Sequence, residues 1–177
     1  EYMSLELTLT ISFLIILILG TLLHFTHDWF KGKGLLLHLF SALNESTWEH
    51  MKLLLFPTLL VILFQYFIFR NTYGNLWNAW LILLVVEMST MPLVFELLRV
   101  AMKKVPFWIT ITIFILSIVF GILAEYFVLK NNFFVLNEIF ALIAVSVIIF
   151  LFFVFSFNPP RIWIFKDPIK KKYGDLN

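Results

Sequence analysis

The chain has 177 residues, of which 62% are hydrophobic, 19% are aromatic and only 14% are charged, with a net charge of +2. A soluble domain is about a quarter charged and just under half apolar, and a globule of this length leaves roughly a third of its chain surface in water. Together with a mean hydropathy of +0.97, this composition excludes a soluble enzyme, a disordered protein and a nucleic-acid-binding module. It predicts an all-α integral membrane protein. Because the chain has no cysteine, it has no disulfide, thiolate metal site or cysteine nucleophile.

Five apolar segments are long enough to cross a bilayer as helices, which takes about 20 residues each. They are residues 5–25, 47–69, 76–98, 107–129 and 133–157. The polar segments between them are short, so we expect antiparallel neighbours in one compact bundle, a single transmembrane domain that spans residues 1–177. The first segment lacks a preceding basic region and a following small-residue cleavage site, so we expect a retained span rather than a signal peptide.

A sixth apolar segment, residues 35–43, is too short to cross the bilayer. We expect it to form a short interfacial or re-entrant helix, and a six-span topology is the alternative. The thirteen Lys and Arg residues fall as none before the first span, then three, one, three, one and five in the successive segments that follow. Basic segments stay in the cytoplasm, so this alternation predicts five spans with the N-terminus outside. A sixth span would break the alternation.

The predicted topology makes residues 158–177 a basic cytoplasmic tail. Clustered lysines favour anionic lipid headgroups by about 1 kcal/mol each near the surface. The partners that we expect are therefore the lipid bilayer and these headgroups, with no nucleic acid, and the expected location is a cell membrane. The sequence leaves open whether the protein forms an oligomer.

All four histidines lie in one short part of the chain, at the cytoplasmic ends of the first two spans. Imidazole and carboxylate groups are common ligands of zinc and similar divalent ions. No spacing here specifies a metal by itself, and histidines at a membrane interface also serve simply as anchors. The candidate residues of this binding or metal site are His24, His27, Asp28, His38, Glu45, Glu49 and His50.

The segment before the second span also has a structural explanation. Ser46 and Glu49 have the spacing of a capping box, in which Ser46 caps the helix and Glu49 reaches back to the Ser46 backbone N–H. Negative charge is favoured at a helix N-terminus, which also suits Glu45. This interpretation leaves Asn44, Trp48 and His50 unexplained.

Acidic residues within the predicted spans form a second group of candidates. Glu87 is near the middle of the third span, where an acidic side chain costs roughly 2.5–3.5 kcal/mol on insertion scales. Glu125 and Glu138 lie toward the outer ends of the fourth and fifth spans, and Glu96 lies one turn from Arg99, with which we expect a local ion pair. Glu87, Glu125 and Glu138 could form a path for a proton or cation. They could equally be neutral acids that hold helices together.

Two sequence blocks carry a resemblance to a known family. Asn44 to Lys52 reads N-E-S-T-W-E-H-M-K, and the C-terminal region reads N-P-P from Asn158, then F-K-D-P from Phe165 and Y-G from Tyr173. Both blocks resemble motifs of a family of small, uncharacterised multi-pass bacterial membrane proteins. The resemblance covers nearly the whole chain. It implies a multi-pass architecture and marks these positions, but it implies no activity.

Three hypotheses about function follow. The first is a cytoplasmic-face site that binds a cation, a proton or a small polar ligand, with transport coupled through Glu87. The second is a metal-dependent membrane hydrolase or transferase that uses the same residues on a lipid-borne substrate, since a bound metal lowers the pKa of water. The third is a non-catalytic scaffold. Whether the protein is an enzyme stays open at this point.

The predicted orientation can be tested with cysteine labelling, because the chain has no native cysteine. Single cysteines introduced at Asn71 and Asn131 are expected to react with an impermeant maleimide in intact cells. Cysteines at Lys33 and Lys171 are expected to react only after the membrane is opened. Labelling of either cytoplasmic position in intact cells would contradict the orientation.

Overall fold

The structure is a computed structural model that describes residues 3–29, 39, 42, 44–102 and 105–173, with only the backbone described at 27–29. Within this part of the chain it is helical and has no strand beyond an isolated bridge between Lys166 and Tyr173. The helices are α1 (Leu5–Trp29), α3 (Thr47–Phe69), α4 (Leu76–Ala101), α5 (Phe107–Lys130), α6 (Glu138–Phe157) and the short 3₁₀ helix η1 (Trp163–Phe165).

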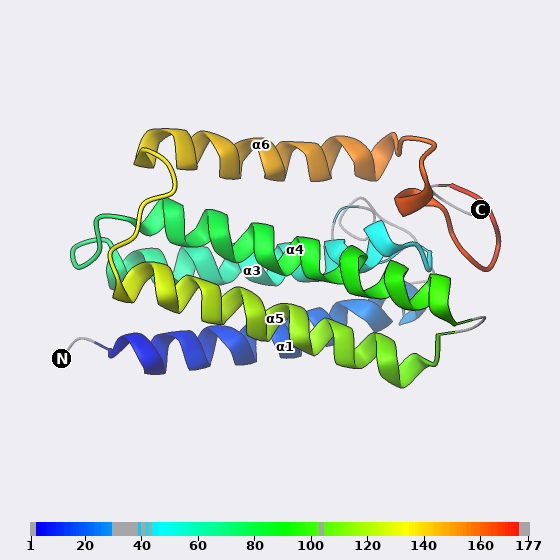
Figure 1. Ribbon diagram of the computed structural model, residues 1–177, viewed down its shortest axis with the longest axis horizontal. Helices are drawn as coiled ribbons and strands as arrows, with labels where there is room; N and C mark the ends of the chain where they lie inside the picture. The colour runs from blue at the N-terminus through cyan, green and yellow to red at the C-terminus, as the bar shows by residue number, and fades with distance from the viewer. Residues whose placement is uncertain (1–2, 30–38, 40–41, 43, 103–104, 174–177) are drawn as a thin grey trace.

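Five of these helices, α1 and α3 to α6, are long and apolar enough to cross a membrane. This confirms the five predicted helical segments, although α1, α4, α5 and α6 each differ from the prediction at one end. Successive helices run in opposite directions, so the N-terminus and residues 70–75 lie at one end of the molecule and the C-terminal segment lies at the other (Figure 1). The predicted short helix at 35–43 falls outside the described residues, apart from positions 39 and 42.

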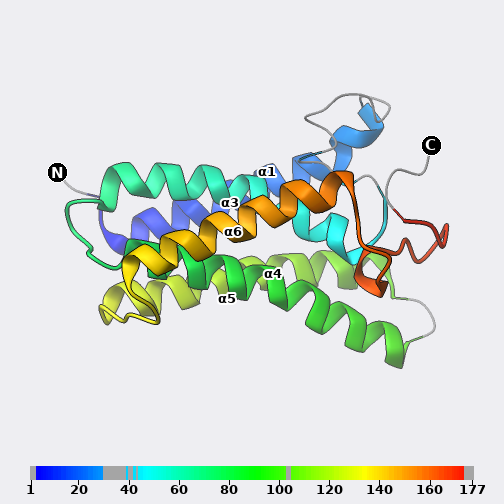
Figure 2. The same cartoon turned by 90° about the horizontal axis from the view of Figure 1, so that it is seen from above.

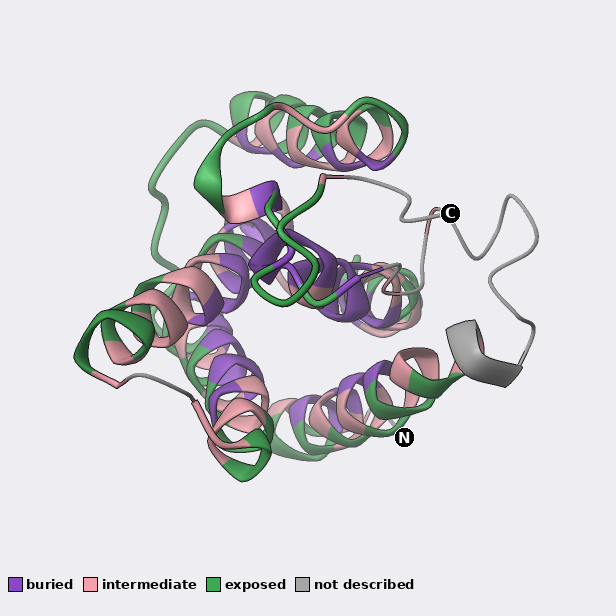
Figure 3. Cartoon of the chain, turned by 90° about the vertical axis from the view of Figure 1, so that its right-hand side faces the viewer, coloured by how far each residue is buried: buried purple, intermediate pink, exposed green. Residues whose placement is uncertain are grey.

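Four helices form a closed ring in which α1 contacts α3 and α5, and α4 contacts the same two helices from the other side. Helix α6 packs on the outside of α4 and crosses the bundle obliquely (Figures 1 and 2). The buried faces of the helices turn toward one another, and α3 has the largest buried share (Figure 3). Because α6 packs on one side only, its buried residues form a single stripe at helical spacing: Ala141, Val145, Phe152 and Ser156.

Helices α4 and α5 approach each other closely at Gly121. A Cβ atom built on Gly121 would lie 3.0 Å from Leu83 Cδ1 and 3.1 Å from Glu87 Cβ. A small residue at such a contact lets the two backbones pack together, which is the usual way to gain van der Waals contact between membrane helices. Gly121 therefore sets the distance between the helices that hold Glu87 and Glu125.

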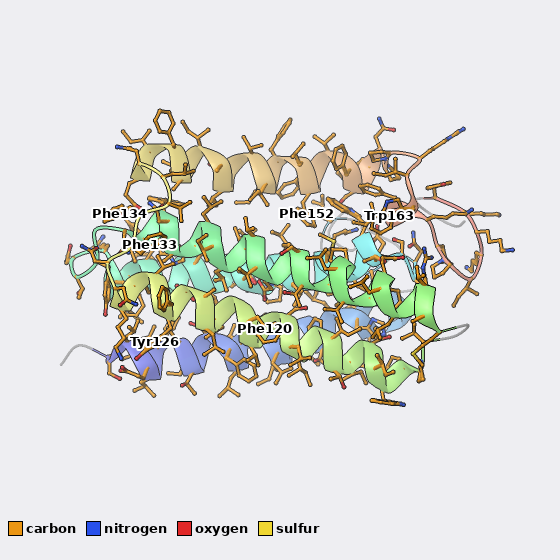
Figure 4. The ribbon with its side chains drawn as sticks, viewed as in Figure 1. Phe120, Tyr126, Phe133, Phe134, Phe152 and Trp163 are labelled. Atoms are coloured by element: carbon orange, nitrogen blue, oxygen red, sulfur yellow. The ribbon has the colours of Figure 1, made fainter. Side chains whose placement is uncertain are left out.

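Helix α6 begins at Glu138 and not at residue 133, so the predicted start of the last span is wrong. The side chain of Asn78 accepts hydrogen bonds from the N–H groups of Val135 and Leu136, both at 2.8 Å. Asn137 then caps the helix by accepting from Ile139 N–H at 3.0 Å. The contacts with Asn78 satisfy the backbone N–H groups of Val135 and Leu136 without a helix, and Phe133 and Phe134 lie in this connection (Figure 4).

Substitution of Gly121 with leucine is expected to destabilise the bundle, because the added side chain has to displace Leu83 and the Glu87 Cβ. Overpacking of this kind costs about 1–3 kcal/mol. The measurement is the thermal melting temperature of the purified protein in detergent, followed by circular dichroism. Gly74 is the matched control, since a Cβ there meets no atom within 4 Å; equal melting of Gly121→Leu and Gly74→Leu would contradict this packing.

Candidate functional site

The two sequence blocks that carried the family resemblance meet in the structure. The backbone N–H of Glu45 donates to Asp167 Oδ2 at 3.2 Å, and Asp167 Oδ1 accepts from Ile169 N–H at 2.7 Å and from Lys170 N–H at 2.8 Å. One buried carboxylate therefore ties the C-terminal segment to the residues that precede α3. Charge-assisted hydrogen bonds of this kind are the strong ones in proteins.

An aromatic cluster completes this junction. The indole of Trp48 stacks on Phe152 of α6 with ring centroids 4.2 Å apart, and it lies 4.5 Å from Phe165 of η1. Trp48 is thus enclosed by two elements distant in the sequence. This contact explains a tryptophan that the sequence left without a role. It is a packing contact and brings no reactive group together.

Ser46 caps α3, since its side chain accepts a hydrogen bond from Glu49 N–H at 3.4 Å. The Ser46 N–H donates to Asn44 Oδ1 at 2.8 Å, so Asn44 takes the position that a capping box assigns to Glu49. The Glu49 carboxylate instead accepts from Lys52 Nζ at 2.8 Å, and both side chains are buried. A buried ion pair is tolerated where the geometry and further hydrogen bonds offset desolvation.

His24 and His50 lie side by side although they come from different helices. Their ring centroids are 5.8 Å apart with an interplanar angle of 34°. His50 Nδ1 lies 3.0 Å from the Ser46 carbonyl oxygen, which can only accept, so Nδ1 carries a proton. His50 Nε2 faces Glu45 Oε2 at 3.6 Å. Two imidazoles and one carboxylate therefore gather at this end of the bundle.

The remaining candidates of the histidine group lie beyond this description. The side chains of His27 and Asp28 and the whole of His38 are outside the described residues. Among the residues that the structure does describe, no group of three or more His, Cys, Asp or Glu side chains could hold a metal ion. The candidate zinc site thus stays a prediction.

An apolar pocket of about 150 Å³ adjoins the histidine pair. It lies between α1, α3, α4 and α5, and His24, His50, Thr21 and Thr110 are its polar or ionisable lining residues. The rest of the lining is hydrocarbon, aromatic or glycine: Gly20, Phe25, Leu53, Met91, Phe107, Ile111 and Phe114. The sequence alone could not reveal this pocket, because its residues come from four separate segments.

Glu87 and Glu125 are both fully buried, at 0% exposure, and Glu125 lies one helical turn from Gly121, where α5 packs against Glu87. Glu87 Oε2 accepts a hydrogen bond from Thr58 Oγ1 at 2.7 Å. The other Glu87 oxygen and both oxygens of Glu125 have no hydrogen-bond partner among the described residues. We refer to Glu87 and Glu125 as the acid pair.

Gln65 of α3 stands beside the acid pair. Its amide faces the Glu125 carboxyl, donates to Ser12 Oγ at 3.0 Å and accepts from Trp80 Nε1 at 2.7 Å. The sequence analysis missed the contacts that Ser12, Thr58 and Trp80 make here. A usable signal was present, because residues 58 and 65 are polar, lie in one apolar span and are separated by about two helical turns, which puts them on one face.

Glu138 has a different environment from the acid pair. Its carboxylate accepts from the backbone N–H groups of Trp77 at 3.0 Å and Asn78 at 3.1 Å. These are unpaired donors in the first turn of α4, where negative charge is favoured. Glu138 therefore caps α4. Glu96 pairs with Arg99 at 2.7 Å, as its spacing predicts.

Substitution of Asp167 with alanine is expected to release the C-terminal segment, because it strands the N–H groups of Glu45, Ile169 and Lys170. The cost is about 1.5–3 kcal/mol for each hydrogen bond to a charged group. Faster tryptic cleavage at Lys170–Lys172 measures the release. Glu45→Ala is the control, since Glu45 contributes only its backbone N–H; equal cleavage of Asp167→Ala and wild type would contradict the tie.

Comparison with known proteins identifies the family of the chain but no individual relative. Neither the curated proteins nor the solved structures contain a significant match to the chain. The model of a family of unknown function, DUF6512, matches residues 2–175, which is nearly the whole sequence. This agrees with the expected uncharacterised family, although the match does not test the individual motifs. The chain belongs to this family of unknown function, DUF6512.

Proposed function

We propose that the protein is a multi-pass protein of the bacterial cytoplasmic membrane that binds and passes protons through the acid pair, as the coupling site of a transporter. One observation carries the proposal: three carboxyl oxygens of Glu87 and Glu125 lie fully buried and make no hydrogen bond of normal geometry with the described residues, even though the Gln65 amide faces Glu125. Structural acids elsewhere in the chain, such as Glu138, have partners.

Burial explains why the acid pair suits proton exchange. An ionised carboxylate in an apolar interior costs several kcal/mol unless it is paired, so the neutral form is favoured where no cation stands beside it. A neutral acid brings its own O–H donor, and two neighbouring acids can pass a proton between them. An intramembrane acid of this kind is a functional candidate by default.

The histidine pair supports exchange with the cytoplasm under the predicted orientation. An imidazole ring can both donate and accept a proton, and His50 precedes Thr58, the donor to Glu87, by about two helical turns on the same helix. Apolar residues of the pocket lie between the two levels. Protons therefore cross this gap only in a second conformation, as transport requires.

A second candidate function is a zinc-dependent hydrolase or transferase that acts on a lipid-borne substrate. The adjacency of two imidazoles, 5.8 Å apart, to an apolar pocket favours it. His24 and His50 would supply two ligands, and a bound metal would lower the pKa of a water molecule. Stoichiometric zinc in the purified protein, lost in both His24→Ala and His50→Ala, would favour this candidate.

Glu87→Gln and Glu125→Gln are expected to abolish proton movement while the fold is kept, because an amide retains most of the hydrogen bonds of a neutral acid. The measurement is dye-reported proton flux into vesicles of reconstituted protein under an imposed potential. Infrared spectra of the same proteins are expected to lose part of the carbonyl band of neutral carboxylic acids. The matched control is Glu96→Gln, which removes a partly exposed acid that pairs with Arg99.

Three outcomes separate the hypotheses. Flux that Glu87→Gln and Glu125→Gln leave unchanged in folded protein would contradict the proposal and favour a scaffold, in which the acids only join helices. Flux that depends on sodium rather than on pH would replace the proton with a cation. The absence of a neutral-acid infrared band would show that the acid pair is ionised.

A further inference from the structure

The pocket beside the histidine pair has the size and lining of a hydrocarbon site. Its volume is about 150 Å³. An engineered apolar cavity of about the same volume stays dry and binds benzene, so the pocket suits a stretch of roughly six carbon atoms. Water gains little in such a space, because it would find too few hydrogen-bond partners.

The pocket opens toward the side of the bundle that would face lipid. Phe25, Phe107 and Ile111 line it and are 42%, 63% and 43% exposed. Exposed apolar residues of this kind lie among hydrocarbon chains when the helices span a membrane. The pocket can therefore be reached from the bilayer, where lipid chains are the most concentrated apolar molecules.

The two imidazoles lie at one end of the pocket, which gives it a direction. His24 and His50 are one helical turn closer to the end of the bundle than Gly20 and Leu53. Phe114 likewise lies about two turns deeper than Phe107 on α5. A ligand with its head at the imidazoles and its chain directed inward would have the orientation of a lipid in that leaflet.

The hydrogen-bonding geometry at this end favours an acidic head. His50 Nδ1 is held by the Ser46 carbonyl oxygen at 3.0 Å, so Nε2 is the nitrogen that faces a ligand. A carboxyl group and an imidazole share one proton between them, and a charge-assisted hydrogen bond of this kind is shorter and stronger than a neutral one. Glu45 Oε2 lies 3.6 Å from His50 Nε2, but the Glu45 side chain is 53% exposed. It can turn into water when another carboxylate takes its place.

We infer that this pocket binds a single-chain anionic amphiphile, a long-chain fatty acid, with its carboxylate at His24 and His50 and its first carbons between α1 and α5. The site is separate from the acid pair, so Glu87→Gln leaves it intact. The inference does not rest on the proposed proton transfer.

The experiment uses the purified full chain in phosphatidylcholine nanodiscs and a palmitic acid analogue with a photoreactive diazirine in its chain. The label is expected on peptides that contain Gly20 or Phe114. Palmitic acid competes, whereas hexadecanol, which has the same chain without the charge, competes about tenfold less well. His50→Gln is expected to remove this preference for the acid.

Two pocket variants and one matched control test the position. Thr110→Trp fills the pocket from α5 and Ile111→Trp covers its mouth, so both are expected to lose the label. Thr112→Trp, on an exposed face of the same helix, keeps it, as does Glu87→Gln. Label spread over all helices and unchanged by Thr110→Trp and Ile111→Trp in folded protein would overturn the inference, and so would equal competition by hexadecanol.

Discussion

The close packing of α4 against α5 is the contact on which the rest of the structure depends. Gly121 brings the α5 backbone to within van der Waals reach of Leu83 and Glu87, and α4 is also the helix that contacts α3 and α6. In a membrane the helices gain little from the hydrophobic effect, because lipid is as apolar as the side chains. Close backbone approach and buried hydrogen bonds must therefore supply the specificity of assembly.

Carboxylates at both ends of the bundle are hydrogen-bonded, whereas those inside it are left incomplete. At one end, the Asn78 side chain accepts hydrogen bonds from the N–H groups of Val135 and Leu136, and the Glu138 carboxylate accepts one from the Asn78 N–H. At the other end, Asp167 holds Glu45 N–H. Between them, three carboxyl oxygens of the acid pair have no donor among the described residues. Structural polar groups are normally paired, so this contrast is the reason to look for function in the interior.

The acid pair and the apolar pocket occupy different levels of the same helices. Met91 lines the pocket and lies one turn from Glu87 on α4, and Phe114 lines it about two turns from Gly121 on α5. The pocket is lined mostly by apolar side chains, whereas the acid pair is polar, so the two sites suit different chemistry. They share the helices whose mutual packing Gly121 determines.

The sequence by itself determined the five apolar helices, because span length and hydropathy are local properties that the bilayer imposes on each segment. It also singled out Ser46 as a helix cap and the Glu96–Arg99 pair, which depend on neighbours within one helical turn. It also identified Glu87 as a candidate by its depth in a span and the histidines by their clustering, but it could not predict which residues lie next to them.

Only the tertiary structure placed Glu125 beside Glu87, His24 beside His50, and Asp167 against Glu45. It also moved the start of α6 to Glu138, since Asn78 from another helix binds the preceding backbone. These contacts join residues far apart in the chain, and their geometry follows from how helices pack rather than from the pattern within any one of them.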